Sequence, residues 1–499
     1  MSDTSTHRFS SRWGLILSVL GIAVGTGNIW RFPRIAAANA GEDGAGAFLV
    51  AWLAFLFLWS IPLIIAEYAL GQKGRQGVVG TFARLAGPKF AWVGAFVAFV
   101  AAAIMCYYSV VAGWCAYYLA TSTVAGLPVS SETALAGWEA FQSGGWPLVL
   151  HGLMMALGVA ACWQGVKSIE RANKVLVPTL LVIVVIAVIR AVTLPGSGAG
   201  IRYLFTPDWS TLGNATLWLE ALTQNAWDTG AGWGLILTYG AYMRREDGVV
   251  RNSLLTGIGN NTVSLLSATM IFGIVFATLG TQLPQAEVLD IMQNSGDRST
   301  GLTFIWMPAL FAEMPFGRPL AILFFLALTF AALSSLISMI ELSSRVFVDL
   351  GIQRSKALIG VGLAAFAIGL PSALYGNFFG NQDFVWGVAL MISGGFISLA
   401  VWRYGAKRLR EEVAVESDWT LPRFWDFWIR FAIPALAVVL LGWWLWQAAT
   451  AYSENWWDPF EPYSAASCLL QWSVALAILF ALNKWMVSRL DLPETSDSQ

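Results

Sequence analysis

The chain has 499 residues, of which 57% are hydrophobic and only 12% are charged, and its formal net charge is −1. A soluble protein would carry about 25% charged residues, so a soluble fold is excluded. The balanced charge excludes the basic surface typical of nucleic-acid binding, and apolar runs of about 20 residues exclude a porin-like barrel. The sequence therefore predicts an all-α polytopic protein embedded in the lipid bilayer.

Twelve apolar segments are long enough to cross a bilayer as helices. In chain order they lie near residues 12–37, 45–70, 90–122, 147–165, 171–193, 216–243, 251–280, 319–347, 356–372, 383–402, 425–449 and 466–488. Most Lys and Arg residues fall in the connections on the side of the N-terminus, so we expect both termini in the cytoplasm of a multi-pass plasma (inner) membrane protein. Residues 1–11 and 489–499 are then cytoplasmic segments, and residues 281–318 form a long extracellular loop.

The first and sixth spans carry helix-breaking residues at membrane depth. Residues 21–33 read GIAVGTGNIWRFP, and residues 224–234 read QNAWDTGAGWG. Each interior Gly costs a helix about 1 kcal/mol relative to Ala, and an Arg near the bilayer centre costs about 3 kcal/mol or more. Close helix packing at the glycines is an alternative, but it does not account for the polar Asn28 and Asp228 beside them.

Two interrupted helices in matching places predict a five-plus-five inverted repeat with a binding site near the bilayer midplane. The first repeat would span residues 12–193 and the second residues 216–403, with residues 425–488 as two additional helices. Unwound backbone is tolerated at depth only where it lines a cavity or a ligand. Free carbonyl, amide and hydroxyl oxygens suit a hard cation such as Na⁺, and half-helix N-termini favour a carboxylate.

Residues 21–33 and 224–234, the Ser pair in AALSSLIS, and IPLIIAEYALGQ with Glu67 closely resemble the neurotransmitter:sodium symporter family. The resemblance runs through spans 1 to 10. It implies the inverted-repeat fold, with unwound helices 1 and 6, and the inward movement of amino acids or related amines with Na⁺. The absence of HExxH, GxSxG and P-loop motifs from the sequence agrees with a carrier rather than an enzyme.

The resemblance implies two sodium sites and one substrate site. One sodium site would use backbone carbonyls and two hydroxyls, from Gly21, Val24, Ala331, Ser334 and Ser335. The other would combine the carboxylate of the substrate with groups of Ala23, Asn28, Asp228 and Asn260. The substrate carboxylate would meet the backbone near Thr26 and Gly27 and the hydroxyl of Tyr108, and its amine would meet the carbonyls of Ala23, Trp227 and Asp228.

The side-chain walls of this substrate site would be Thr26, Ile104, Trp227, Gly230, Trp233, Ser335 and Met339. Gly25 stands where amine-transporting members have Asp, which favours a substrate with its own carboxylate. We therefore expect a neutral, hydrophobic or mid-to-large amino acid as the small-molecule partner. The sequence leaves open which amino acid this is, the number of ions carried with it, and the oligomeric state.

Asp228 departs from the family, whose members usually have Thr or Ser at this position. Chloride-dependent relatives bind Cl⁻ beside the sodium, and chloride-independent bacterial relatives have a span-7 Glu where this chain has Ser264. Gln224 remains from the expected chloride ligands, whereas the span-2 hydroxyl position holds Trp52. We expect Asp228 to be the fixed anion that removes the need for chloride.

Two other roles for Asp228 stay open. Its carboxylate could bind a cationic side chain or the amine of the substrate. It could also take up and release a proton and so couple transport to H⁺. A proton-coupled amino-acid or amine transporter is therefore an alternative to a sodium symporter. A receptor with a transport fold, which binds its ligand without moving it, is another.

The resemblance also implies an outer and an inner gate. Arg31 would face Asp383 above the substrate, with Trp227 as an aromatic lid. On the inner side Tyr242 and Asp349 match family positions, and we expect Arg8 to be the partner of Asp349. Glu341 on span 8 is a further buried acid to which the sequence assigns no role.

Overall fold

The computed structural model describes residues 8–293, 301–416 and 418–492, and the regular elements in these ranges are helices. The expected segments 1–11, 281–318 and 489–499 therefore lie partly outside the described residues. Helices suit this sequence because a helix pairs its own backbone polar groups, which lipid cannot do.

Among the described residues, eight helices are long and apolar enough to cross a membrane alone. Three bent helix pairs pass the same test together, namely Arg12–Ala23 with Thr26–Ala38, Ser131–Ser143 with Trp146–Cys162, and Ala465–Ala481 with Asn483–Arg489. In the second of these pairs we count only Trp146–Cys162 as the span, because the bend of 72° turns the first helix away from it. Helices α11 and α12, separated by residues 229–234, complete the expected twelve spans. In chain order the spans are α1 (Arg12–Ala23) with α2 (Thr26–Ala38), α3 (Gly46–Phe55) with α4 (Ile61–Gly74), α6 (Ala91–Val124), α8 (Trp146–Cys162), α9 (Val166–Val192), α11 (Ala215–Asp228) with α12 (Leu235–Gly240), α13 (Val249–Thr278), α16 (Gly317–Asp349), α17 (Arg354–Leu374), α18 (Gly376–Tyr404), α20 (Phe424–Phe427) with α21 (Ile433–Thr450), and α22 (Ala465–Ala481) with α23 (Asn483–Arg489).

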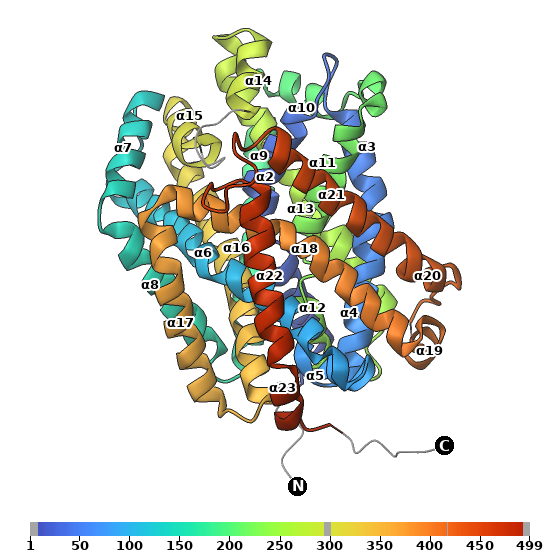
Figure 1. Cartoon of the computed structure of the whole chain (residues 1–499). Coiled ribbons are helices and arrows are strands. Elements are labelled where there is room, and N and C mark those ends of the chain that lie inside the picture. The colour runs from blue at the N-terminus through green and yellow to red at the C-terminus, as the bar shows by residue number, and fades with distance from the viewer. Residues whose placement is uncertain (1–7, 294–300, 417, 493–499) are drawn as a thin grey trace, which may run out of the picture.

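Short helices lie in the connections, namely α5 (Val78–Leu85), α7 (Ser131–Ser143), α10 (Ser197–Phe205), α14 (Gln285–Gln293), α15 (Met307–Glu313) and α19 (Ala406–Glu412). Figure 1 shows α5, α19 and α23 at one end of the bundle and α7, α10, α14 and α15 at the other. We call the first the inner end and the second the outer end. Ser10 and Asp491, close to the two ends of the described chain, both lie at the inner end, where they contact Arg244 and Gln76.

The two longest helices, α6 and α16, pack against each other inside the bundle (Figure 1), and α16 also packs against α9 and α17. Helix α1 packs against α9, α13 and α16. The tenth span begins at Gly376 rather than near residue 383. Asp383 is therefore inside a helix, two turns from its start, and its direction is fixed by the packing of that helix.

Both spans that carry the glycine pairs are broken, as expected. Helix α1 ends at Ala23, α2 begins at Thr26, and the two are bent by 46°. Helix α11 ends at Asp228 and α12 begins at Leu235. In the second break three glycines have φ of 69°, 88° and 77°, a region that side chains disfavour, at Gly230, Gly232 and Gly234.

Candidate functional site

A cavity of about 930 Å³ lies between the two broken helices. Its lining runs from Ile104 and Met339, deep in the bundle, to Gln447 and Tyr452 near the outer end of α21, so it opens toward the outer end. All residues expected around a substrate contribute to the lining, which brings together Ala23, Thr26, Gly27, Ile104, Tyr108, Trp227, Asp228, Gly230, Trp233, Ser335 and Met339.

One corner of the cavity is polar and lies at the N-terminus of α2. The Tyr108 hydroxyl is 3.3 Å from the backbone nitrogen of Thr26 and 3.2 Å from its Oγ1. A Cβ on Gly25 would lie 3.1 Å from Ser335 Oγ and 3.3 Å from the Tyr108 hydroxyl, so only glycine leaves this corner open. A hydroxyl beside the positive end of a helix dipole is a suitable place for a carboxylate.

The rest of the inner cavity is apolar. Ile104 and Met339 are buried, and the indole nitrogen of Trp233 is turned away to donate to the Ala226 carbonyl at 3.3 Å. A Cβ on Gly230 would lie 3.1 Å from the Ile22 side chain, so the glycine sets the width of this compartment. The arrangement joins a polar corner to an apolar pocket, as a zwitterion with a hydrophobic side chain requires.

Oxygen atoms converge beside the first break. One terminal amide atom of Asn260 lies 2.9 Å from the Ala23 carbonyl oxygen and 3.2 Å from that of Asp228. The same atom lies 2.8 Å from Asn28 Nδ2. If this Asn260 atom is the nitrogen, it can donate to both carbonyls, but it then faces the donor Asn28 Nδ2. If it is the oxygen, it accepts from Asn28 Nδ2, but it then faces the two carbonyl oxygens. An oxygen in this position together with a cation satisfies every neighbour.

Asn28 turns its nitrogen to this cluster. Its Nδ2 donates to Ser264 Oγ at 2.7 Å, while its Oδ1 accepts from the backbone N–H of Gly25 at 2.8 Å. The nitrogen of the Asn28 amide, and not its oxygen, therefore faces the Asn260 cluster.

A second group of oxygens lies where α1 ends against α16. Ser335 Oγ donates to the carbonyls of Gly21 and Ile22 at 3.3 and 3.4 Å, and Ser334 Oγ donates to the Ala331 carbonyl at 3.0 Å. The residues expected for the second sodium site are all buried at this junction, namely Gly21, Val24, Ala331, Ser334 and Ser335. Carbonyl and hydroxyl oxygens are hard ligands without formal charge.

Asp228 lies between the two breaks. Its Oδ2 accepts hydrogen bonds from Gln224 Nε2 and, at 3.5 Å, from Ser264 Oγ. Its Oδ1 has no hydrogen-bond partner and faces Gly27, where a Cβ would lie only 2.7 Å away. The carboxylate thus occupies the space between the two residues that the resemblance associates with chloride. Trp52 instead packs its ring against Phe32, with 4.4 Å between centroids.

Glu67 on α4 holds the unwound part of the sixth span. Its carboxylate accepts from the backbone N–H of Gly232 at 2.5 Å and of Leu237 at 3.0 Å, and it is fully buried. Backbone donors freed by unwinding must find acceptors at this depth. Glu67 supplies them from a neighbouring helix.

The outer part of the cavity carries charged groups. Arg31 and Asp383 both line it, and the Arg31 guanidinium lies 4.1 Å from the centre of the Trp227 ring. Arg34 and Glu220, to which the sequence assigns no role, line the same region. Arg34 follows Arg31 by three residues, and this spacing, which puts both on one helix face, was the available signal.

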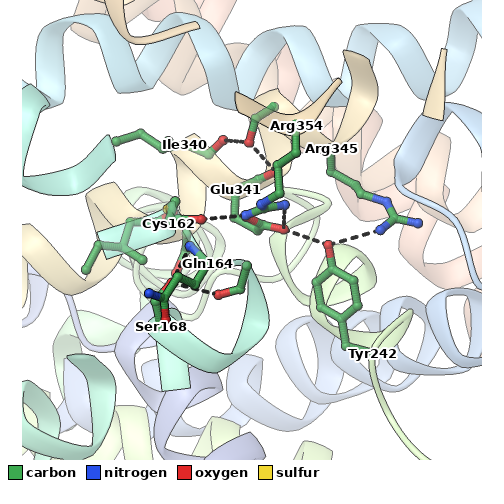
Figure 2. Close-up of polar contacts among 12 residues, drawn as sticks. Cys162, Gln164, Ser168, Tyr242, Ile340, Glu341, Arg345 and Arg354 are labelled. Carbon is green, nitrogen blue, oxygen red and sulfur yellow. Dashed lines mark hydrogen bonds and ion pairs between the residues drawn. The ribbon is translucent and has the colours of Figure 1, made fainter. Parts of the chain in front are cut away.

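A polar network closes the inner end (Figure 2). The Tyr242 hydroxyl donates to Glu341 Oε1 at 2.6 Å, and Arg354 Nη2 forms an ion pair with Glu341 Oε2 at 2.5 Å. Arg354 also donates to the Cys162 carbonyl at 2.7 Å, so the network joins α16, α17, the end of α8 and the segment after α12. Glu341, to which the sequence assigns no role, is the centre of this network.

The ion-pair partner of Asp349 differs from the expectation. Asp349 Oδ1 pairs with Arg345 Nε at 2.7 Å, whereas the resemblance suggested Arg8, which is exposed. Arg345 lies one turn earlier on the same helix, so the pair forms without ordering the N-terminal segment. That segment is held elsewhere, through Ser10, whose backbone N–H donates to Glu170 at 2.8 Å and whose carbonyl accepts from Arg244 at 2.9 Å.

Known proteins resemble this chain over most of its length. The model of the sodium:neurotransmitter symporter family matches residues 6–143 and 136–491. A sodium-dependent transporter of Methanocaldococcus jannaschii is 32% identical over 463 residues, 88% of this chain and 91% of that protein. A sodium-dependent transporter of Bacillus subtilis is 29% identical, and the match covers 88% of this chain and 98% of that protein.

Among solved structures, MhsT in complex with L-phenylalanine matches with a TM-score of 0.76 and 30% identity, over 87% of this chain and 98% of that one. This match confirms the all-α fold of twelve spans with two broken helices in an inverted repeat. The relatives are transporters rather than enzymes, which agrees with the expectation of a carrier. With the family model matched from residue 6 to residue 491, the chain belongs to the sodium:neurotransmitter symporter family.

Proposed function

We propose that this protein is a sodium-coupled symporter that imports a neutral, hydrophobic or mid-to-large amino acid by alternating access, with two Na⁺ sites and no need for chloride. The observation that carries the proposal is the single cavity between the two broken helices. It joins a polar corner at Tyr108 to an apolar compartment, and its lining includes Ala23 and Asp228, whose carbonyls belong to the oxygen cluster at Asn260.

The shape of the cavity supports an amino acid as the substrate. The corner formed by Gly25, Thr26 and Tyr108 suits a carboxylate, and the carbonyls of Ala23 and Asp228 are acceptors for an ammonium group. The compartment between Ile104 and Met339 then takes an apolar side chain. The similar protein MhsT has been solved with L-phenylalanine, which supports a substrate of this class.

The position of the Asn260 cluster supports coupling to sodium. Because Ala23 and Asp228 contribute carbonyls to it and also line the cavity, an ion there would lie beside the bound substrate. A substrate carboxylate that completes the ion shell makes each ligand bind better in the presence of the other. An inward membrane potential would add about 2.3 kcal/mol per charge per 100 mV.

The surroundings of Asp228 support chloride independence. The carboxylate is buried against Gln224 and Ser264 and brings a fixed negative charge next to the Asn260 cluster. A fixed anion balances the charge of a nearby cation without a mobile counter-ion. The buried and unpartnered Asp228 Oδ1 also keeps proton coupling as the second candidate.

Alternating access requires that the inner end open while the outer end closes. The cavity opens toward the outer end, and the network around Glu341 closes the inner end. We assign the inner end and both termini to the cytoplasm of the plasma membrane. Arg31, Asp383 and Trp227 would then close over the substrate, and the contacts of Tyr242 and Asp349 would break to release it.

The test is uptake by purified protein in liposomes with an imposed inward Na⁺ gradient, after thermal-shift screening of the twenty amino acids has identified the substrate. We expect accumulation with Na⁺ and none when choline replaces it. Accumulation driven by a proton gradient without Na⁺ would favour the second candidate. Binding without accumulation under either gradient would contradict the proposal and indicate a receptor.

A further inference from the structure

A buried amide lies between the second group of oxygens and the inner end of the molecule. Asn173 on α9 has an exposed fraction of 0%, and neither its Oδ1 nor its Nδ2 has a hydrogen-bond partner. Buried amides are almost always hydrogen-bonded, because burial removes their contacts with water. An amide with both atoms unpaired by protein binds water or another group, and its neighbours decide which.

Asn173 points at the end of α1. A Cβ on Gly21 would lie 3.2 Å from Asn173 Oδ1 and 3.3 Å from the Cβ of Ser334. Gly21 and Ser334 are two of the residues expected to hold the second sodium ion. The amide oxygen thus borders the site from α9, a helix that the expected ligand set does not include.

Ser18 adds a second unpaired oxygen on the same side. Its hydroxyl is fully buried and has no hydrogen-bond partner. On α1 it lies between Gly14 and Gly21, which face Glu170 and Asn173 of α9, respectively. Helix geometry therefore directs Ser18 toward α9 at the level between these contacts.

Further polar groups lie between Asn173 and the inner surface. Glu170 lies one turn inward of Asn173 on α9 and forms an ion pair at 2.8 Å with Lys174, whose side chain is 41% exposed. The order along α9 and α1 is thus the expected sodium ligands, then Asn173 and Ser18, then the buried Glu170 carboxylate, whose partner Lys174 reaches the surface. Two neutral oxygens followed by a carboxylate are suited to a cation and unsuited to an anion.

We propose that the Asn173 amide oxygen, assisted by the Ser18 hydroxyl, is an additional ligand of the Na⁺ of the Gly21–Ser334 site, on its inner side. The inference rests on the proposed sodium coupling. It adds to that site a ligand from α9.

The test uses the purified full-length protein and two matched substitutions, Asn173→Leu and Asn252→Leu. Asn252 on α13 is also buried with both amide atoms unpaired, so it controls for removing such an amide. The readouts are the Na⁺ concentration that gives half-maximal thermal stabilisation and the thermal stability without Na⁺. We expect Asn173→Leu to raise the half-maximal Na⁺ concentration about tenfold, with Asn252→Leu within about twofold of the parent.

Leu has a shape similar to Asn, so Asn173→Leu should fold and be at least as stable as the parent without Na⁺. A variant with a gain of stability and an unchanged Na⁺ response would overturn the proposal. If Asn173→Leu does not fold, Asn173→Asp decides, since its carboxylate should lower the half-maximal Na⁺ concentration, and an increase would refute the ligand role. A parent that shows no Na⁺ response would instead refute the proposed sodium coupling itself.

Discussion

Arg345 and Asp349 form an ion pair within one helix, with 2.7 Å between Nε and Oδ1 at the inner end of α16. Their side chains are only 16% and 5% exposed. Asp349 Oδ2 also accepts a hydrogen bond from the backbone N–H of Gly77 at 2.5 Å. This bond connects α16 to the segment after α4. The ion pair at this point is therefore made within α16 and does not use the exposed Arg8.

The first prediction concerns this ion pair. Arg345→Ala leaves a nearly buried carboxylate without its partner, a change that costs about 3–5 kcal/mol in such settings. We expect loss of uptake and faster amide hydrogen exchange at residues 9–12, because the inner closure loosens. Arg8→Ala should behave like the parent in both measurements. If Arg8→Ala reduced uptake and raised hydrogen exchange as much as Arg345→Ala does, Arg8 would take part in closing the inner end.

A second prediction concerns the charge of Asp228. Uptake by the parent should survive replacement of chloride by gluconate, because the carboxylate supplies the negative charge. Asp228→Ser, which installs a residue usual in the family, should make uptake depend on chloride, since Gln224 and Ser264 remain as donors to an anion. Glu220→Gln is the matched control, because it removes another carboxylate of the cavity without touching this cluster. Collapse of parental uptake in gluconate would refute the assignment.

A third prediction concerns Gly25. Gly25→Asp would put a carboxylate within reach of Tyr108 and Ser335, where we expect the carboxylate of the substrate. Two carboxylates in one buried corner repel each other, so amino-acid affinity should fall at least about tenfold. The decarboxylated amine of the same substrate should bind better to the variant than to the parent. Competition binding with the two ligands measures both effects, and unchanged amino-acid affinity would place the carboxylate elsewhere.

A fourth prediction concerns the support of the sixth span. Glu67→Gln replaces an acceptor oxygen by a donor opposite the N–H groups of Gly232 and Leu237. Leaving such a buried donor unpaired costs about 1–3 kcal/mol. We expect a lower unfolding temperature, faster hydrogen exchange at Gly232 and weaker substrate binding. The surface substitution Glu411→Gln should change none of these, and a variant of Glu67 that exchanges like the parent would argue against the supporting role.

The two predicted helix breaks do not say which end of the cavity is closed, and the structure shows that this is the inner end. The cavity reaches the outer end past Arg31 and Trp227, while Phe9 packs against Tyr239 and Tyr242 at the inner end, with ring centroids 5.8 and 6.4 Å apart. The aromatic contacts and the Glu341 network lie on the same side of the cavity. They must separate together for the inner end to open.

The sequence by itself determined the spans and the two breaks. Apolar length and helix-breaking residues act locally, since a glycine pair beside Asn28 or Asp228 destabilises a helix whatever surrounds it. The position of a residue in the cavity also followed from the sequence, because the resemblance carries residues such as Ile104 and Met339 over one by one.

Only the tertiary structure decided which polar groups meet. It paired Asp349 with Arg345 and not with Arg8, made Glu341 the centre of a network, and brought Asn173 to Gly21. Contacts between helices depend on the rotation and relative shift of each helix, and these are fixed by the packing of all side chains together. A residue's spacing along the chain fixes its helix face, but the neighbour that this face meets is decided by the assembled bundle.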